Sequence, residues 1–105
     1  MITGVVVARK KFAEENPEEI QEFLKEYHTS VDYVNENVKD AAQLIEKYDI
    51  VPAAVAEKAL PACNIVCIDG EEMKEKLSGY LEVLNAQNPQ AVGGEIPEND
   101  FYYIQ

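Results

Sequence analysis

The apolar positions of this chain follow two patterns, continuous runs at two places and a helical period elsewhere. Residues Ile2–Ala8 form a nearly uninterrupted apolar run that is rich in valine. β-Branched side chains suit a pleated strand, and an apolar run without polar alternation is typical of a strand covered on both faces. A shorter run over Asn64–Ile68 predicts a second strand. We expect the two strands to lie in one small sheet.

Outside these runs, apolar residues recur every three or four positions, which predicts amphipathic helices. Asn16, Asn37 and Asp69 stand where a capping side chain is expected, and Pro17 suits a first helical position. The predicted helices cover residues 10–15, 17–36, 38–48, 52–60 and 70–86. The longest of them carries an apolar stripe made of Ile20, Phe23, Leu24, Tyr27, Val31 and Val34. The sequence therefore predicts an α/β fold dominated by four or five helices.

The tail of the chain changes character after Asn88-Pro89. It contains Gly93-Gly94 and, just before the last residue, Phe101-Tyr102-Tyr103-Ile104. Three consecutive aromatic residues are costly to leave in water, so they either pack against the body or form a surface for another protein. The chain shows no repeat and no linker, and its 105 residues are expected to form a single domain or fragment.

Charge separates the start of the chain from the rest. Nine basic residues oppose twenty acidic ones, which gives a net charge of −11 and a pI near 4.4. Arg9, Lys10 and Lys11 make the first twelve residues +3, so the remaining chain carries −14. Nucleic acid and anionic membrane are therefore unfavourable partners, because both are themselves negatively charged.

The apolar runs are too short to cross a bilayer, which takes about 20 residues in a helix. The start of the chain also lacks the basic region and small-residue cleavage site of a signal peptide. We therefore expect neither a membrane helix nor a targeting signal in this chain.

Residues that could carry chemistry are few. Cys63 and Cys67 would lie ~13 Å apart in an extended chain, beyond disulfide reach, and we expect buried thiols. His28 flanks the apolar stripe without a companion nucleophile. Ser30 and Ser78 lie inside predicted helices, unlike the serine of a carrier protein. No phosphate loop or nucleophile elbow is present, so we expect no enzyme activity, metal or cofactor.

Several motifs, taken in order, resemble the closing third of bacterial ABC-transporter solute-binding proteins. The first is Gly4-Val5-Val6-Val7-Ala8-Arg9-Lys10-Lys11-Phe12, followed by Asn16-Pro17-Glu18, Phe23-Leu24 and the helix from Asn37 to Ala42. The end is similar as well, with Asn88-Pro89-Gln90-Ala91-Val92-Gly93-Gly94-Glu95-Ile96-Pro97 and then Asp100-Phe101-Tyr102. The group that it resembles binds nitrate, sulfonates, taurine or thiamine-precursor pyrimidines.

The resemblance implies part of a type II periplasmic-binding-protein fold. A full member has about three times this length, with two lobes that close on a solute, so this chain corresponds to a C-terminal fragment. The parent would be an extracytoplasmic lipoprotein or periplasmic protein that delivers its solute to an ABC permease. Thr3 and Gly4 are the candidate ligand-binding residues, and Tyr102 and Tyr103 are weaker candidates.

Two further expectations concern partners. The alternative to solute binding is a stand-alone acidic module that binds other proteins and no small ligand. In either case, the valine run and the aromatic tail would need cover, so we expect a homodimer held by strand pairing or by an exchanged terminal segment.

Overall fold

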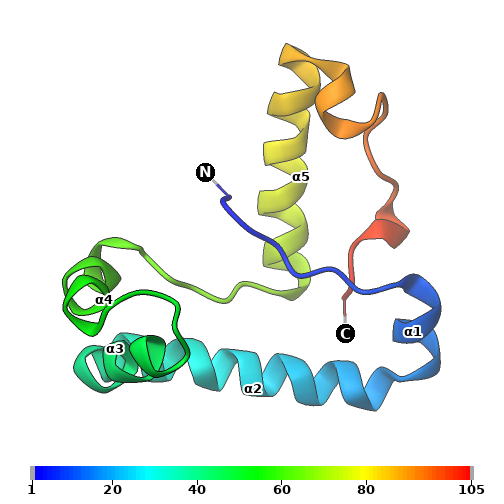
Figure 1. Cartoon of the computed structure of the whole chain (residues 1–105). Helices are drawn as coiled ribbons and strands as arrows, with labels where there is room; N and C mark the ends of the chain where they lie inside the picture. Colours follow the sequence, from blue (N-terminus) through cyan, green and yellow to red (C-terminus); the bar gives the residue numbers. More distant parts are fainter. Residues whose placement is uncertain (1, 105) are drawn as a thin grey trace. The chain divides into compact units, whose positions relative to one another are not determined.

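The computed structural model describes residues 2–104, which fold into helices joined by turns and by two extended segments (Figure 1). The chain divides into two compact units. One consists of residues 2–7 and 68–104, and the other of Ala8–Cys67. Five α-helices are present among the described residues, four of them in the second unit.

The Ala8–Cys67 unit is entirely helical where it has regular structure. Its elements are α1 (Lys10–Glu15), α2 (Pro17–Glu36), α3 (Val38–Lys47), α4 (Ala53–Ala59) and the 3₁₀ helix η1 (Leu60–Ala62). Pro17 occupies the first turn of α2 together with Glu18 and Glu19, whose charges favour the positive end of the helix dipole. These boundaries confirm the helices predicted between residues 10 and 60.

The two asparagines expected to cap helices act differently from the prediction. Asn16 and Asn37 do precede α2 and α3, but neither side chain accepts a bond from the helix that follows. Instead the Asn16 Nδ2 donates to the carbonyl of Phe12 at 3.0 Å, and the Asn37 Nδ2 donates to that of Tyr33 at 3.3 Å. Each asparagine therefore satisfies a carbonyl of the preceding helix.

The buried residues of this unit are small. Ala41 and Ala42 of α3 and Ala56 of α4 are at most 3% exposed, and Leu60 is also buried. Alanine lets two helix backbones approach closely, and α3 and α4 pack together more extensively than any other pair of elements. The stripe of α2 is only half-buried, and its Phe23 remains 45% exposed. The core of the unit therefore lies between α3 and α4.

The other unit is built around α5 (Gly70–Gln87). After it come the 3₁₀ helices η2 (Pro89–Val92) and η3 (Asn99–Phe101), and α5 packs against η2. On the surface of α5, the Lys76 Nζ lies 3.0 Å from the Glu72 Oε1. Gly93 has a φ of 78°, a left-handed conformation that suits glycine, and it ends η2.

The predicted small sheet is wrong. No strand occurs within residues 2–104, so Ile2–Ala8 and Asn64–Ile68 are extended segments without regular structure. Both have strand composition, but a strand also needs a neighbour for its N–H and C=O groups. Val5, Val6 and Val7 are 60%, 61% and 80% exposed, so they lack the cover that the apolar run predicted. The fold class is therefore helical.

Candidate functional site

Thr3 and Gly4 lie in the extended segment before α1. Both are exposed, and their backbone belongs to no helix or strand. A Cβ atom added at Gly4 would meet no heavy atom within 4 Å. An open backbone and a hydroxyl can reach a small polar solute, but no other polar side chain is bonded to either residue in the part of the chain described. Within residues 2–104, no hydrogen bond therefore links Thr3 or Gly4 to a further member of a polar site.

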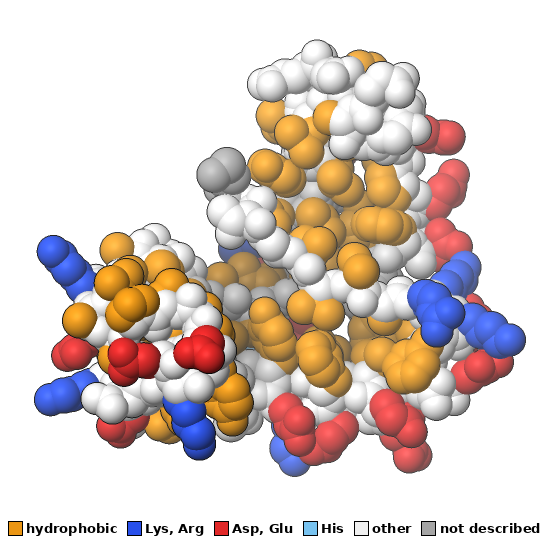
Figure 2. Space-filling model, viewed as in Figure 1, with side chains coloured by type: hydrophobic (Ala, Val, Ile, Leu, Met, Phe, Trp, Pro, Cys, Tyr) orange, Lys and Arg blue, Asp and Glu red, His pale blue; other side chains and the backbone are white. Residues whose placement is uncertain are grey.

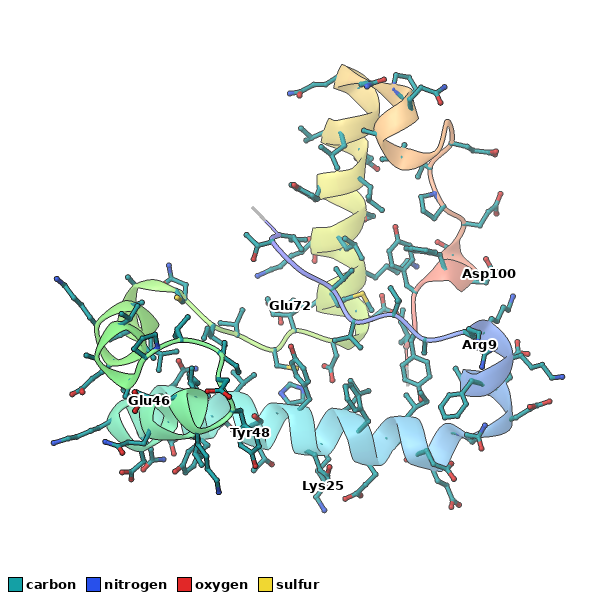
Figure 3. All side chains as sticks on the ribbon, viewed as in Figure 1. Arg9, Lys25, Glu46, Tyr48, Glu72 and Asp100 are labelled. Carbon is teal, nitrogen blue, oxygen red and sulfur yellow. The ribbon has the colours of Figure 1, made fainter. Side chains whose placement is uncertain are left out.

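An open depression lies elsewhere, at the turn between α3 and α4. It has a volume of about 250 Å³ and is lined by Glu46, Asp49, Ile50, Val51 and Pro52. Figure 3 shows Glu46 and Tyr48 at this end of the unit. Two carboxylates beside apolar side chains could contact a cationic, partly apolar group.

The local sequence explains how this depression arises. Asp49 has a φ of 56°, a left-handed conformation that aspartate tolerates better than most residues. Its N–H donates to the carbonyl of Glu46 at 2.9 Å, and Pro52 then precedes α4. The break in helical periodicity at residues 49–52 predicted the turn. No signal in the sequence predicted that its side chains would line a depression.

The extended segment over Asn64–Ile68 is tied to α2 by one side chain. The Asn35 Nδ2 donates to the Ile65 carbonyl at 3.0 Å, across 30 positions of sequence. Val66 beside it remains 64% exposed. Asn35 was not identified from the sequence, because a polar residue on an exposed helix position does not indicate which distant carbonyl it will meet.

Cys63 and Cys67 do not form a disulfide, and neither is buried. Cys63 is exposed and Cys67 is half-buried, which corrects the expectation of buried thiols. His28 is half-buried on α2, at the edge of the apolar stripe as predicted. Within residues 2–104, no three His, Cys, Asp or Glu side chains gather in a way that could hold a metal ion.

The aromatic tail is divided between interior and surface. Tyr102 is 8% exposed, Tyr103 is half-buried and Phe101 is 57% exposed. The rings of Phe101 and Tyr102 meet edge to face, with centroids 5.2 Å apart. Tyr102 therefore packs against the body as one expectation had it, whereas Phe101 remains accessible to another protein.

Charged and apolar side chains share the surface of both units. Figure 2 shows hydrophobic side chains gathered over α5. Arg9 stands at the start of α1, next to the extended segment (Figure 3). Lys11 lies 3.9 Å from Glu15 in an exposed pair, which has little energetic weight.

Among the described residues, none of the helices has the length and apolar character needed to span a membrane. Comparison with protein-family models, with curated proteins and with solved structures finds no match to this chain.

Proposed function

We propose that this chain is the C-terminal part of a solute-binding protein of an ABC import system. The solutes are those of the group that it resembles: nitrate, sulfonates, taurine or pyrimidine precursors of thiamine. The order of motifs over residues 4–42 and 88–102 supports this proposal. The part present here would not bind solute alone, and it would perform no covalent chemistry.

One observation carries the proposal. Residues 3–8 have the composition of a sheet strand, yet their valines are at least 60% exposed. In the family that the chain resembles, a strand at this place returns to the sheet of the first lobe and is followed by helices like α1 and α2. The missing neighbours of the strand would then come from the remainder of the parent protein. The segment over Asn64–Ile68 would also need a neighbouring strand from the parent protein, because its Val66 is exposed.

This placement gives Thr3 and Gly4 a role. At the start of a strand beside the cleft, the Thr3 hydroxyl would hydrogen-bond a polar solute and the Gly4 backbone would let it approach. The two lobes would close around the solute by a hinge and present it to an ABC permease outside the cytoplasm.

The test uses the parent protein, with the coding region upstream of this chain included. Isothermal titration with nitrate, taurine and a thiamine-precursor pyrimidine identifies the solute. Thr3→Val should then weaken its binding by about 5- to 100-fold, because it leaves a buried polar group of the solute unpaired. Thr29→Val is the matched control, since the Thr29 hydroxyl donates to the Lys25 carbonyl at 3.0 Å within α2.

Gly4→Ala gives a second, independent readout. The added Cβ meets nothing within 4 Å in this chain, so its helical folding should be unchanged while solute binding in the parent falls. An upstream region that encodes no first lobe, or a parent that binds none of these solutes, would contradict the proposal.

A stand-alone acidic module that binds other proteins is the second candidate. Tyr48 and Ile50 favour it, because they are 70% and 68% exposed beside the carboxylates of Glu46 and Asp49. Under this proposal the chain would bind a basic, partly apolar partner without any upstream region, and Thr3→Val would have no effect.

A further inference from the structure

The N-terminal extended segment, residues 3–8, has unpaired backbone groups and exposed valines that could pair with another strand. Its backbone groups make no hydrogen bond with any described residue, and its three valines are 60–80% exposed. Water can satisfy the backbone, but it leaves β-branched side chains uncovered. Such an edge is a template for the addition of a further strand.

Charge restricts what that strand can belong to. Arg9, Lys10 and Lys11 follow the segment directly, whereas the rest of the chain carries −14. The partner must therefore tolerate an acidic body and accept cations at one end of the segment. A second copy of this chain meets both conditions, because it carries a net charge of −11 and offers an identical strand to the valines. We propose that two copies pair through residues 3–8 as an intermolecular antiparallel ribbon.

The same cations select the antiparallel direction. A parallel pair would place the two basic triplets side by side, where like charges repel. In the antiparallel pair they lie at opposite ends of the ribbon, about 20 Å apart at 3.4 Å per residue. Two-fold pairing of this kind is also the commonest way in which identical chains associate.

Symmetry and composition then fix the register. Opposite residues of an antiparallel pair point to the same face of the ribbon, and a two-fold axis perpendicular to the ribbon keeps each residue and its copy on the same face. One residue must therefore lie opposite its own copy, at the axis. Centring the axis on Val6 gives three valine–valine pairs, Val6 with Val6 and Val5 with Val7 twice. Centring it on Val5 leaves only one such pair. The proposed register is therefore centred on Val6.

A two-stranded ribbon alone is marginally stable in water, so it needs a supporting element. Residues 2–7 belong to the same compact unit as α5, and Ile2 is already half-buried there. In the dimer, α5 of each copy would therefore support the strand of the same copy. This inference concerns the chain by itself, whereas in the solute-binding proposal the remainder of the parent protein supplies the neighbours of residues 3–8. A monomeric chain would leave the solute-binding proposal untouched.

Light scattering at tens of micromolar protein tests the association. The chain should give twice the monomer mass of 11.8 kDa, and Val6→Lys should return it to the monomer mass by placing two ammonium groups at the axis. Val83→Lys is the matched control, because Val83 is 56% exposed on α5 and should leave the dimer intact. A monomer of the unmodified chain, or a dimer that Val6→Lys does not affect, overturns the proposal.

Cysteine cross-linking tests the register. In a background of Cys63→Ser and Cys67→Ser, with diamide as oxidant, Val6→Cys should link to its own copy, since opposite Cα atoms lie about 5 Å apart. Val5→Cys alone and Val7→Cys alone should not form a disulfide, because in this register each of these residues is a diagonal neighbour of its own copy, about 7–8 Å away. A mixture of the two variants should form one, because residue 5 of one copy lies opposite residue 7 of the other. Self-linking of Val5→Cys without that of Val6→Cys would overturn the register.

Discussion

Tyr102 is a buried residue whose hydroxyl group makes no hydrogen bond within the described residues. Its side chain is 8% exposed, and its hydroxyl oxygen is buried with no hydrogen-bond partner among the described residues. Leaving a buried polar group unpaired costs about 1–3 kcal/mol. The ring offsets part of this cost through burial and through its edge-to-face contact with Phe101. The aromatic body of Tyr102, and not its hydroxyl, therefore holds the tail.

Tyr102→Phe should accordingly stabilise the chain. It keeps the ring contact and removes the unpaired hydroxyl, so the free energy of unfolding should rise by about 1 kcal/mol in urea denaturation followed by circular dichroism. Tyr48→Phe is the control, because Tyr48 is 70% exposed and its replacement should change the value by less than about 0.5 kcal/mol. A loss of stability in Tyr102→Phe would show that the hydroxyl makes a bond in solution.

At the scale of elements, the helices could be predicted and the sheet could not. A helix such as α2 is specified by residues three or four positions apart, and Pro17 marks its start. A strand depends on a neighbour that the local sequence does not contain, so the valines of residues 5–7 indicated strand propensity without a sheet. Even for the helices, the position of Asn16 was predictable but the carbonyl that it bonds was not.

The candidate site also has one part that the sequence predicts and one that it does not. The chemistry of Thr3 and Gly4 predicts a ligand contact, and the structure shows that both residues are exposed. The depression at residues 46–52 depends on the left-handed turn at Asp49 and on how α3 meets α4. That packing is non-local, and no pattern along the chain predicts it.

The close contact between α3 and α4 predicts how a larger side chain at Ala42 would change the free energy of unfolding. Ala42 is 1% exposed, so Ala42→Leu must push the two helices apart and should cost about 1–3 kcal/mol of the free energy of unfolding. Ala54→Leu on the exposed side of α4 is the matched control, and it should change the value by less than about 0.5 kcal/mol. Urea denaturation measures both. Equal stability of the two variants would mean that α3 and α4 do not form the core of their unit.

At the scale of the whole molecule, the net charge of −11 acts on any association. Two copies repel one another through their acidic bodies, while the basic triplet after the valine segment attracts the acidic partner locally. Salt screens both effects, and exposed charge pairs contribute only about 0–1 kcal/mol each. Burial of the valines and the backbone bonds of the ribbon do not depend on salt in this way. The proposed dimer is therefore held mainly by contacts that screening leaves unchanged.

This difference gives a prediction for the dissociation constant of the dimer. Raising NaCl from about 0.05 M to about 0.5 M shortens the screening length from about 14 Å to about 4 Å, and the constant should change by less than about threefold. Analytical ultracentrifugation at both salt concentrations measures it, with Arg9→Gln as a comparison that removes one cation beside the ribbon. A tenfold weakening in high salt, abolished by Arg9→Gln, would mean that ion pairs and not the valine ribbon hold the two copies together.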